Sequence, residues 1–306
     1  KSEPKAHMPC KEWQAAVAFL TWLRQQLAIC GRNCQRVLMV GDGHYDDLKL
    51  WQALPDDIIL LARSAKNRVL YHMPGEQTGR GRRRKYGERA LSPQQLWQSR
   101  SGWRKRTLLV RGRPRHLQVK VRGPFLRKGA PQRPLMLIVV RGKKRKTRSG
   151  GTYRRQPLPF LVNAVQDDQG HWQLPLPLDS LLFWAWQRWE IEVCHRELKS
   201  NFGLGNKQCF NPYAAVLSVQ WSAWVYALLL LAGYRAWGLS GAPDVPTRWW
   251  RGSGRWSLNT LWRAYRAALW DRHHFRPLWS PTSANWPEKD VRVPALRNAI
   301  FASARS

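Results

Sequence analysis

Acidic residues are scarce in this sequence. Its 306 residues include 19 Asp and Glu against 52 Lys and Arg, which gives a formal net charge of +33. A chain with this excess of positive charge repels itself and attracts polyanions, most often the phosphate backbone of a nucleic acid. An anionic membrane surface is the alternative partner. The charge balance therefore predicts a nucleic-acid-binding protein.

Cysteine is also scarce, and its spacing matches no disulfide framework. The five cysteines are Cys10, Cys30, Cys34, Cys194 and Cys209. Cys30 and Cys34 lie four residues apart, but no second Cys or His pair completes a zinc site. We expect five free thiols in a reducing compartment.

Long apolar runs are rare in the sequence. Residues 214–233 form the one run that reaches the length of a membrane span. The run contains Ser218, Gln220 and Ser222, and the rest of the chain is rich in charge. We therefore favour a buried helix of a water-soluble core over a membrane-anchoring helix.

The first part of the chain alternates helical and strand patterns. Residues 11–29 repeat apolar side chains at helical spacing, and Gly31 follows. Residues 37–40 and 58–62 are continuous apolar runs of the kind that form strands buried on both faces, and a second helix is expected at about 46–54. Helix and strand in alternation with short links predict an α/β fold with parallel strands.

The middle of the chain is basic and rich in loops. It contains four short β-like segments, at 107–110, 116–121, 135–140 and 160–165. Runs of Gly, Arg and Lys at 80–85 and 141–148 lie between them. We interpret this part as a β-rich insertion that faces DNA. A disordered basic linker is the alternative, but it explains the arginines and not the apolar strands.

Helical patterns return in the last part of the chain, at about 178–202, 214–237 and 258–270. Gly203 and Gly205 end the first of them. The resulting division is 1–63 for the first part of a core, 64–175 for the basic insertion, 176–240 for core helices and 241–306 for a partly helical tail.

One face of the helix predicted at 178–202 concentrates charge. Because an α-helix turns by about 100° per residue, side chains three, four and seven positions apart share a face. The side chains on the charged face are Arg188, Glu192, His195 and Lys199. Glu190 and Glu197 fall on the opposite face, so the stripe contains a single carboxylate. A surface stripe of ion pairs worth a few tenths of a kcal/mol is the alternative to a functional site.

A second carboxylate, Asp42, follows the apolar run at 37–40. Ligand and metal sites of open α/β sheets form outside the carboxyl ends of the strands. Gly41 and Gly43 let the backbone bend there and let a phosphate approach. The alternative is an Asp that caps the following turn, a role that Asp46 or Asp47 fits better.

These residues resemble a known family. Arg188, Glu192 and Lys199 reproduce the R-x3-E-x6-K part of the Y-x2-R-x3-E-x6-K signature of DDE insertion-sequence transposases. The segment VLMVGDGHYDDLKLWQALP at 37–55 resembles the family's second-Asp motif. The stretches ILLARSAKNRVLY and GRGRRRKYG are similar to the sequence that leads into the family's β-rich insertion. The resemblance covers about residues 11–237.

The resemblance implies an RNase H-like core, a mixed sheet flanked by helices, with a β-rich insertion and a helical C-terminal part. It implies that Asp42 is the second catalytic Asp and Glu192 the catalytic Glu. Both would bind two divalent ions, Mg²⁺ with Mn²⁺ as a substitute, about 3.5–4 Å apart. Hard oxygen ligands suit these ions. The implied activity is metal-dependent DNA strand cleavage and strand transfer.

The implied partner is double-stranded DNA, in the form of transposon ends and target. Arg188 and Lys199 match residues that contact phosphate near the cut. We add His195 of the same stripe and the cations of the first basic run, which are Arg80, Arg82, Arg83, Arg84 and Lys85. The resemblance further implies a homodimer in the bacterial cytoplasm, associated with the nucleoid and not with a membrane.

The sequence departs from the family at two points. Ala185 occupies the position of the signature tyrosine, and no Asp precedes Asp42 to act as the first catalytic Asp. We therefore expect the opening strands of the core to be missing, in either a fragment of a longer transposase or a decayed, inactive copy. A basic nucleic-acid-binding protein without catalysis is the alternative function.

Overall fold

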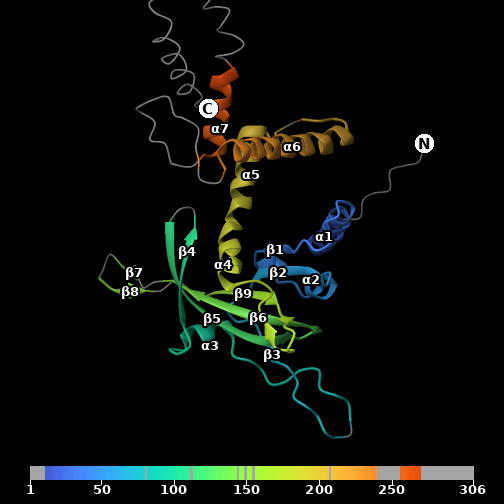
Figure 1. The fold of residues 1–306 in the computed structure, drawn as a ribbon, viewed down its shortest axis with the longest axis vertical. Helices are drawn as coiled ribbons and strands as arrows, with labels where there is room; N and C mark the ends of the chain where they lie inside the picture. Colours follow the sequence, from blue (N-terminus) through green and yellow to red (C-terminus); the bar gives the residue numbers. More distant parts are fainter. Residues whose placement is uncertain are drawn as a thin grey trace, which may run out of the picture. The chain divides into compact units, whose positions relative to one another are not determined.

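The computed structural model describes residues 11–79, 81–110, 113–142, 145–147, 150–153, 156–206, 208–238, 241 and 256–269. The chain forms two compact units, Lys1–Trp189 and Glu190–Ser306, each of which is described by itself. The first unit is a mixed α/β structure built on a seven-stranded sheet (Figure 1). The second is helical.

The sheet of the first unit contains β1 (Val37–Gly41), β2 (Ile58–Arg63), β3 (Tyr71–His72), β4 (Arg104–Val110), β5 (Arg113–Arg127), β6 (Ala130–Arg141) and β9 (Leu158–Asn163). The strand order is β1-β2-β9-β6-β5-β3, and β4 also pairs with β5. β1 and β2 are parallel and the other pairs are antiparallel. Two small hairpins lie outside this sheet, β7 (Arg145–Lys146) with β8 (Thr152–Tyr153) and β10 (Val165–Gln166) with β11 (Trp172–Gln173).

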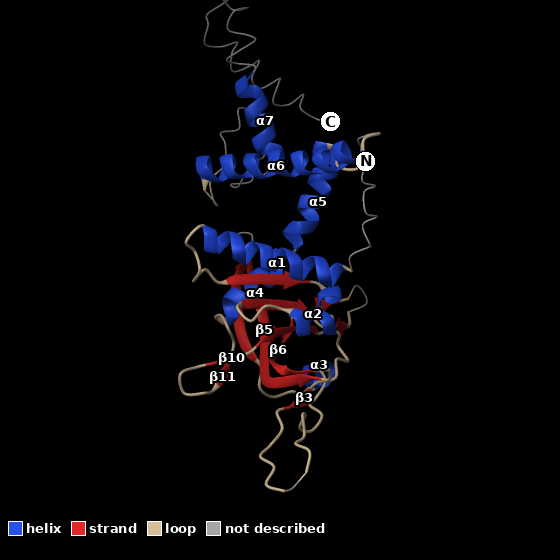
Figure 2. Cartoon of the chain, turned by 90° about the vertical axis from the view of Figure 1, so that its right-hand side faces the viewer, coloured by secondary structure: helices blue, strands red, loops and turns tan. Residues whose placement is uncertain are grey.

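Helices cover both faces of the sheet. They are α1 (Glu12–Ile29), α2 (Leu48–Ala53), α3 (Pro93–Gln98) and α4 (Leu178–Gln187), with a 3₁₀ turn η1 (Gly43–Tyr45) after β1. Apolar residues of α1, α2 and α3 pack on one face of the sheet, and those of α4 pack on the other. α1 lies over β1 and β2 (Figure 2). The sheet is therefore the middle layer of the unit.

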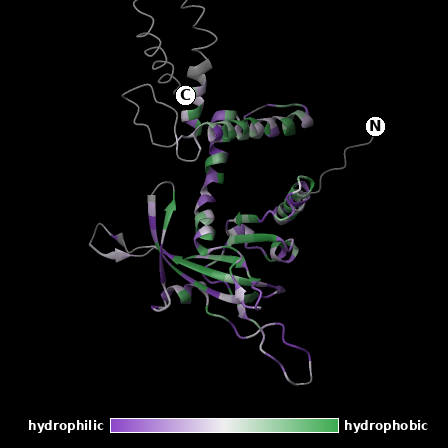
Figure 3. Cartoon of the chain, in the orientation of Figure 1, coloured by the Kyte–Doolittle hydropathy of each residue, from purple (hydrophilic) through white to green (hydrophobic). Residues whose placement is uncertain are grey.

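The alternation of side chains along β6 shows why the apolar runs became central strands. Successive residues of a strand point to opposite faces. Leu137 and Val139 join the cluster under α1 to α3, whereas Ile138 and Val140 join the cluster under α4. A strand buried on both faces must be apolar at every position. The central strands are accordingly drawn mostly in green, the colour of hydrophobic residues, in Figure 3.

Most of the predicted elements are confirmed. The four β-like segments of the middle part are β4, β5, β6 and β9. These strands extend the sheet of β1 and β2 through the β2–β9 pair, so the segment predicted as an insertion shares one sheet with the first part of the core. The helix predicted at 178–202 is divided at Arg188 into α4 and α5 (Trp189–Phe202).

The second unit contains α5, α6 (Pro212–Trp237) and α7 (Leu258–Leu269). Phe202 at the end of α5 is its centre, with ring contacts to Tyr226 of α6 at 5.8 Å and to Trp262 of α7 at 5.7 Å between centroids. The Tyr226 hydroxyl donates to Glu197 Oε2 over 3.0 Å. Ser222 Oγ donates to the Phe202 carbonyl over 3.4 Å, which brings α5 and α6 together at a small residue.

The prediction that α6 is a buried core helix was wrong for the structure described. Its 26 residues make it long and apolar enough to cross a membrane, yet its most apolar stretch is only 6% buried. Apolar side chains surround this helix, whereas in the described residues it packs on α5, α7 and Trp256. The buried positions are the small residues Ser222 and Gly233. Length and composition alone do not distinguish a membrane helix from a helix that a protein surface covers.

Four of the five predicted free thiols lie in the described residues. Cys30, Cys34, Cys194 and Cys209 are free, as predicted. Cys10 lies outside the residues that the structure describes.

Candidate functional site

Asp42 directly follows β1, at the carboxyl end of the parallel pair β1–β2. It is half-buried, and its Oδ1 accepts the backbone N–H of His44 over 2.9 Å, which caps the turn η1. The capping role considered from the sequence is therefore real. A carboxylate offers about four acceptor sites, so one backbone bond leaves capacity for a ligand.

The glycines around Asp42 have a reason within the chain. A Cβ at Gly41 would lie 2.4 Å from the Cβ of Tyr45, so a residue with a side chain does not fit there. A Cβ at Gly43 would meet nothing within 4 Å. Tyr45 packs back over the end of β1, and this contact explains Gly41 without a bound phosphate.

Tyr45 lies between Asp42 and a second acid, Glu12. Burial raises the pKa of the Tyr45 hydroxyl, and a side-chain hydrogen bond with Glu12 and the negative charges of Glu12 and Asp42 raise it further. Glu12, in the first turn of α1, therefore lies at the same edge of the sheet as Asp42. No sequence pattern pairs these positions, since only the packing of α1 on the sheet brings them together.

Asp46 is the most deeply buried acid near this edge, with a side chain that is 0% exposed. Its Oδ2 accepts from Ser64 Oγ over 2.7 Å and from Arg68 Nε over 2.8 Å, and its Oδ1 accepts from Arg127 Nη1 over 2.9 Å and from Trp51 Nε1 over 3.1 Å. Burial lowers the pKa of the Arg127 guanidinium, and the charge of Asp46 opposes that shift. Asp46 is thus a structural anchor for the loop after β2.

The cap of α2 is Asp47. Its Oδ1 accepts the backbone N–H groups of Lys49 and Leu50 over 2.7 and 3.2 Å. The three acids that follow β1 therefore have three roles, because Asp42 caps a turn, Asp46 is a buried ion-pair partner and Asp47 caps a helix.

The charged stripe of α5 faces solvent in the second unit. Glu192, His195 and Lys199 are exposed, whereas Leu198 is buried and Glu197 is held by Tyr226. Three members of the predicted stripe therefore lie at exposed positions of α5, and Glu190 on the other face is exposed as well. Arg188 belongs to the first unit, where its backbone ends α4 by donating to the Trp184 carbonyl over 3.1 Å.

The first basic run lies on a loop between β3 and α3. Arg82, Arg83, Arg84 and Lys85 are exposed, and the backbone N–H of Arg84 donates to Gln77 Oε1 over 3.1 Å. Arg80 lies outside the described residues. Exposed cations of this kind are available to phosphate groups.

The described residues contain no group of three or more His, Cys, Asp and Glu side chains that could hold a metal ion. Asp42 belongs to the first unit and Glu192 to the second. Each has the carboxylate oxygens that Mg²⁺ prefers, so the chemistry of the two residues fits the implied ions. Taken alone, neither carboxylate is a metal site.

A scan against protein-family models and a search of the curated proteins found no match to this chain.

Proposed function

We propose that the chain is part of a DDE-type DNA transposase with an RNase H-like core, and that Asp42 and Glu192 are two of its catalytic carboxylates. One observation carries the proposal. Asp42 directly follows β1, the first strand of the parallel pair β1–β2. The signature residues Glu192 and Lys199 lie together on an exposed face of the later helix α5. The net charge of +33 suits an enzyme that must hold two DNA strands.

The position of β1 in the sheet is compatible with a missing strand of the core. β1 is an edge strand of the sheet, and its one partner among the described residues is β2. A further strand that carries the first catalytic Asp can therefore pair with the outer edge of β1 without displacing another strand. Such a strand would place its Asp near Asp42 and Glu12.

The proposed roles follow from charge and position. The carboxylates of Asp42 and Glu192 would bind the divalent ions, which supply Lewis-acid activation of the attacking and leaving oxygens. Lys199, His195 and Arg188 would bind the phosphates beside the cut and orient the strand for in-line attack. The exposed run from Arg82 to Lys85 would hold DNA away from the cut.

The test measures Mg²⁺- or Mn²⁺-dependent nicking of a supercoiled plasmid by a full-length version of the protein, which supplies the first catalytic Asp, and by two variants of that version. Glu192→Gln removes the proposed ligand at constant shape, and Glu190→Gln is the matched control on the other face of α5. We expect Glu192→Gln to lower the nicking rate by about a hundredfold or more, a typical loss when a group that stabilises charge in a transition state is removed. The control should keep the wild-type rate. Equal rates for the two variants would contradict the catalytic role.

The second candidate is a nucleic-acid-binding protein without catalysis. The net charge of +33 and the exposed cations from Arg82 to Lys85 favour it, because both suit phosphate binding and neither requires catalysis. In that case the full-length version binds DNA but does not nick it with either ion.

A further inference from the structure

A pocket of about 870 Å³ opens in the first unit, beside the carboxyl end of β2. Four segments that are distant in sequence form its walls, namely the loop 64–67, residues 114–117 of β5, residues 156–159 at the start of β9, and Trp186 of α4. A volume of this size matches the usual range for small-molecule and cofactor sites.

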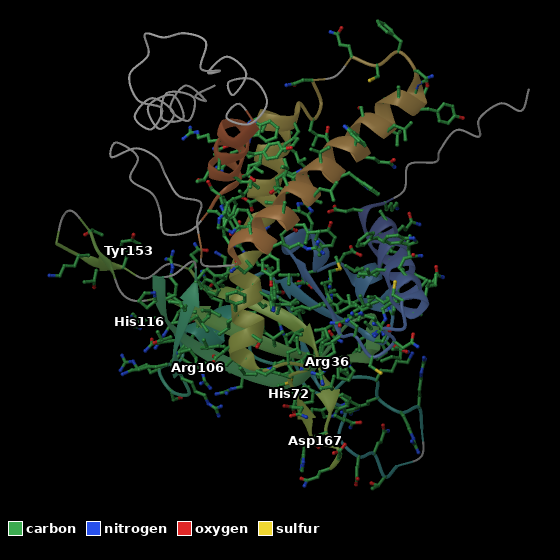
Figure 4. All side chains as sticks on the ribbon, turned by 45° about the horizontal axis from the view of Figure 1, so that its top comes forward. Arg36, His72, Arg106, His116, Tyr153 and Asp167 are labelled. Atoms are coloured by element: carbon green, nitrogen blue, oxygen red, sulfur yellow. The ribbon has the colours of Figure 1, made fainter. Side chains whose placement is uncertain are left out.

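The mouth of the pocket is positively charged. Arg63, Lys66, Arg115 and His116 line it, and its lining includes no Asp or Glu. Arg63, Lys66 and Arg115 are exposed, so their charges face solvent and are available to an anion. His116 projects from the hairpin near Arg106 (Figure 4), where its Nδ1 lies 3.0 Å from Thr107 Oγ1. The charge pattern selects an anionic ligand.

The interior of the pocket is apolar and includes an indole ring. Leu117 and Val140 are buried, Leu158 is half-buried, and Trp186 is half-buried against the same apolar cluster. A hydrated inorganic anion gains nothing from such an interior. Bases in a duplex are stacked on each other, so they cannot reach it. An unpaired nucleotide has both an anionic phosphate and a free aromatic face that can stack on tryptophan.

The pocket opens at the sheet edge where Asp42 lies. Gly41 and Ala62 are register partners on the parallel strands β1 and β2. Asp42 and Arg63 are the next residues of the two strands, so they are neighbours at this edge, where strands lie about 4.8 Å apart. A strand bound through Arg63 would therefore pass Asp42.

The loop that forms one wall is fixed by the buried carboxylate of Asp46. Ser64 begins the loop, and its Oγ donates to Asp46 Oδ2 over 2.7 Å. Arg68, just beyond the loop, pairs with the same oxygen at 2.6 Å. Both ends of the loop are thus anchored to Asp46, which fixes the backbone that carries Lys66.

We propose that this pocket binds an unpaired stretch of nucleic acid, with phosphates on Arg63, Lys66 and Arg115 and a base against Trp186. The inference rests on the proposed function for the identity of that strand as DNA and for its delivery to Asp42. It specifies which form of the polyanion the first unit holds beside that residue.

The test uses fluorescence anisotropy with two labelled probes, an oligothymidine of six nucleotides and a blunt duplex. The pocket variant is Lys66→Gln with Arg115→Gln, and the control variant is Lys49→Gln with Lys128→Gln, two exposed lysines outside the pocket lining. Both pairs remove two charges. We expect the pocket variant to weaken oligothymidine binding by about tenfold or more. It should also reduce the slope of log affinity on log salt by about 1.4, since each phosphate contact to a single strand contributes about 0.7.

A third variant, Trp186→Leu, tests the stacking contact. It should weaken oligothymidine binding by about fivefold or more and leave the salt slope unchanged, because it removes an aromatic face and no charge. Thermal unfolding of each variant shows whether the fold is intact.

The proposal is overturned if wild-type chain does not bind oligothymidine, if the pocket and control variants lose equal affinity, or if duplex binding falls as much as oligothymidine binding. Its failure is distinct from that of the proposed function. If the chain binds oligothymidine in the pocket but the full-length version never nicks plasmid DNA, this site is retained and the catalytic proposal is lost.

Discussion

Strand β6 in the first unit and helix α6 in the second are both apolar segments, but the apolar stretch of β6 is buried and α6 is mostly exposed. From Leu135 to Val140, β6 is buried at every position, between helices on both faces of the sheet. α6 leaves large side chains such as Trp221, Trp224 and Leu228 more than half exposed. The difference lies in the partners of each segment and not in its composition.

The comparison shows what an apolar run does and does not predict. A run of apolar residues indicates that burial is favourable, at about 25 cal/mol for each Å² removed from water. It does not say which element covers it. In the first unit the covering helices belong to the described part of the chain, whereas on α6 the described residues fully bury only Ser222 and Gly233.

The largest expected effect concerns a charged group in the well-packed unit. Asp46→Ala would leave Arg68 and Arg127 without their buried carboxylate, and breaking a buried ion pair from one side typically costs about 3–5 kcal/mol. Urea unfolding should show this loss in the free energy of unfolding of the first unit. Amide exchange in α5 and α6 should stay unchanged.

Asp47→Ala serves as the control for this variant, because it removes only the cap of α2 and should cost about 1 kcal/mol. Equal losses for the two substitutions would show that Asp46 does not anchor the loop after β2.

The second prediction applies one substitution to both segments. Leu137→Ala in β6 removes a side chain that is 0% exposed, and large-to-small changes at such sites cost about 2–5 kcal/mol. Leu228→Ala in α6 removes one that is 57% exposed and should change stability by less than about 0.5 kcal/mol. Thermal and urea unfolding measure both. A large loss from Leu228→Ala would mean that a covering surface buries α6 in solution.

The smallest effect concerns the polar contact between α5 and α6. Burial raises the pKa of Tyr226, and its hydrogen bond with Glu197 and the charge of that carboxylate raise it further. Tyrosine in the unfolded chain ionises near pH 10. Above that pH the unfolded state loses the proton that the folded state keeps, so the stability of the second unit should fall.

Tyr226→Phe should cost about 1 kcal/mol at neutral pH, the usual net value of one hydrogen bond, and should flatten the fall above pH 10. Tyr213→Phe, an exposed tyrosine of the same helix, is the control. Amide exchange in α5 between pH 7 and 10.5 reports on the local stability. An identical response of the two variants would contradict the role of the Tyr226–Glu197 contact.

Local patterns predicted the elements of the fold because their causes are local. The spacing of apolar residues set α1 and α5, and continuous apolar runs set β1, β2 and β6. Membership of one sheet was not predictable in this way. β2 pairs with β9, about a hundred residues later, and only the folded chain shows that the basic middle part continues the sheet.

In the candidate site, too, features with local causes were predicted and features that depend on distant contacts were not. That Glu192, His195 and Lys199 share one face of α5 follows from helical geometry and was predicted. The buried role of Asp46 depends on Arg68 and Arg127, which lie 22 and 81 residues away in sequence. Glu12 lies near Asp42, and the pocket forms, only through contacts between segments that are distant in sequence. No short sequence motif predicts either feature.

The described residues leave the apolar surface of α6 exposed, so two opposing forces act between molecules in solution. The net charge of +33 keeps molecules apart, while the exposed apolar side chains of this helix favour contact between them. Salt shortens the reach of the repulsion, from about 30 Å at 0.01 M to about 8 Å at 0.15 M, and leaves the apolar attraction in place. Added salt will therefore weaken the repulsion between molecules and promote self-association of the chain.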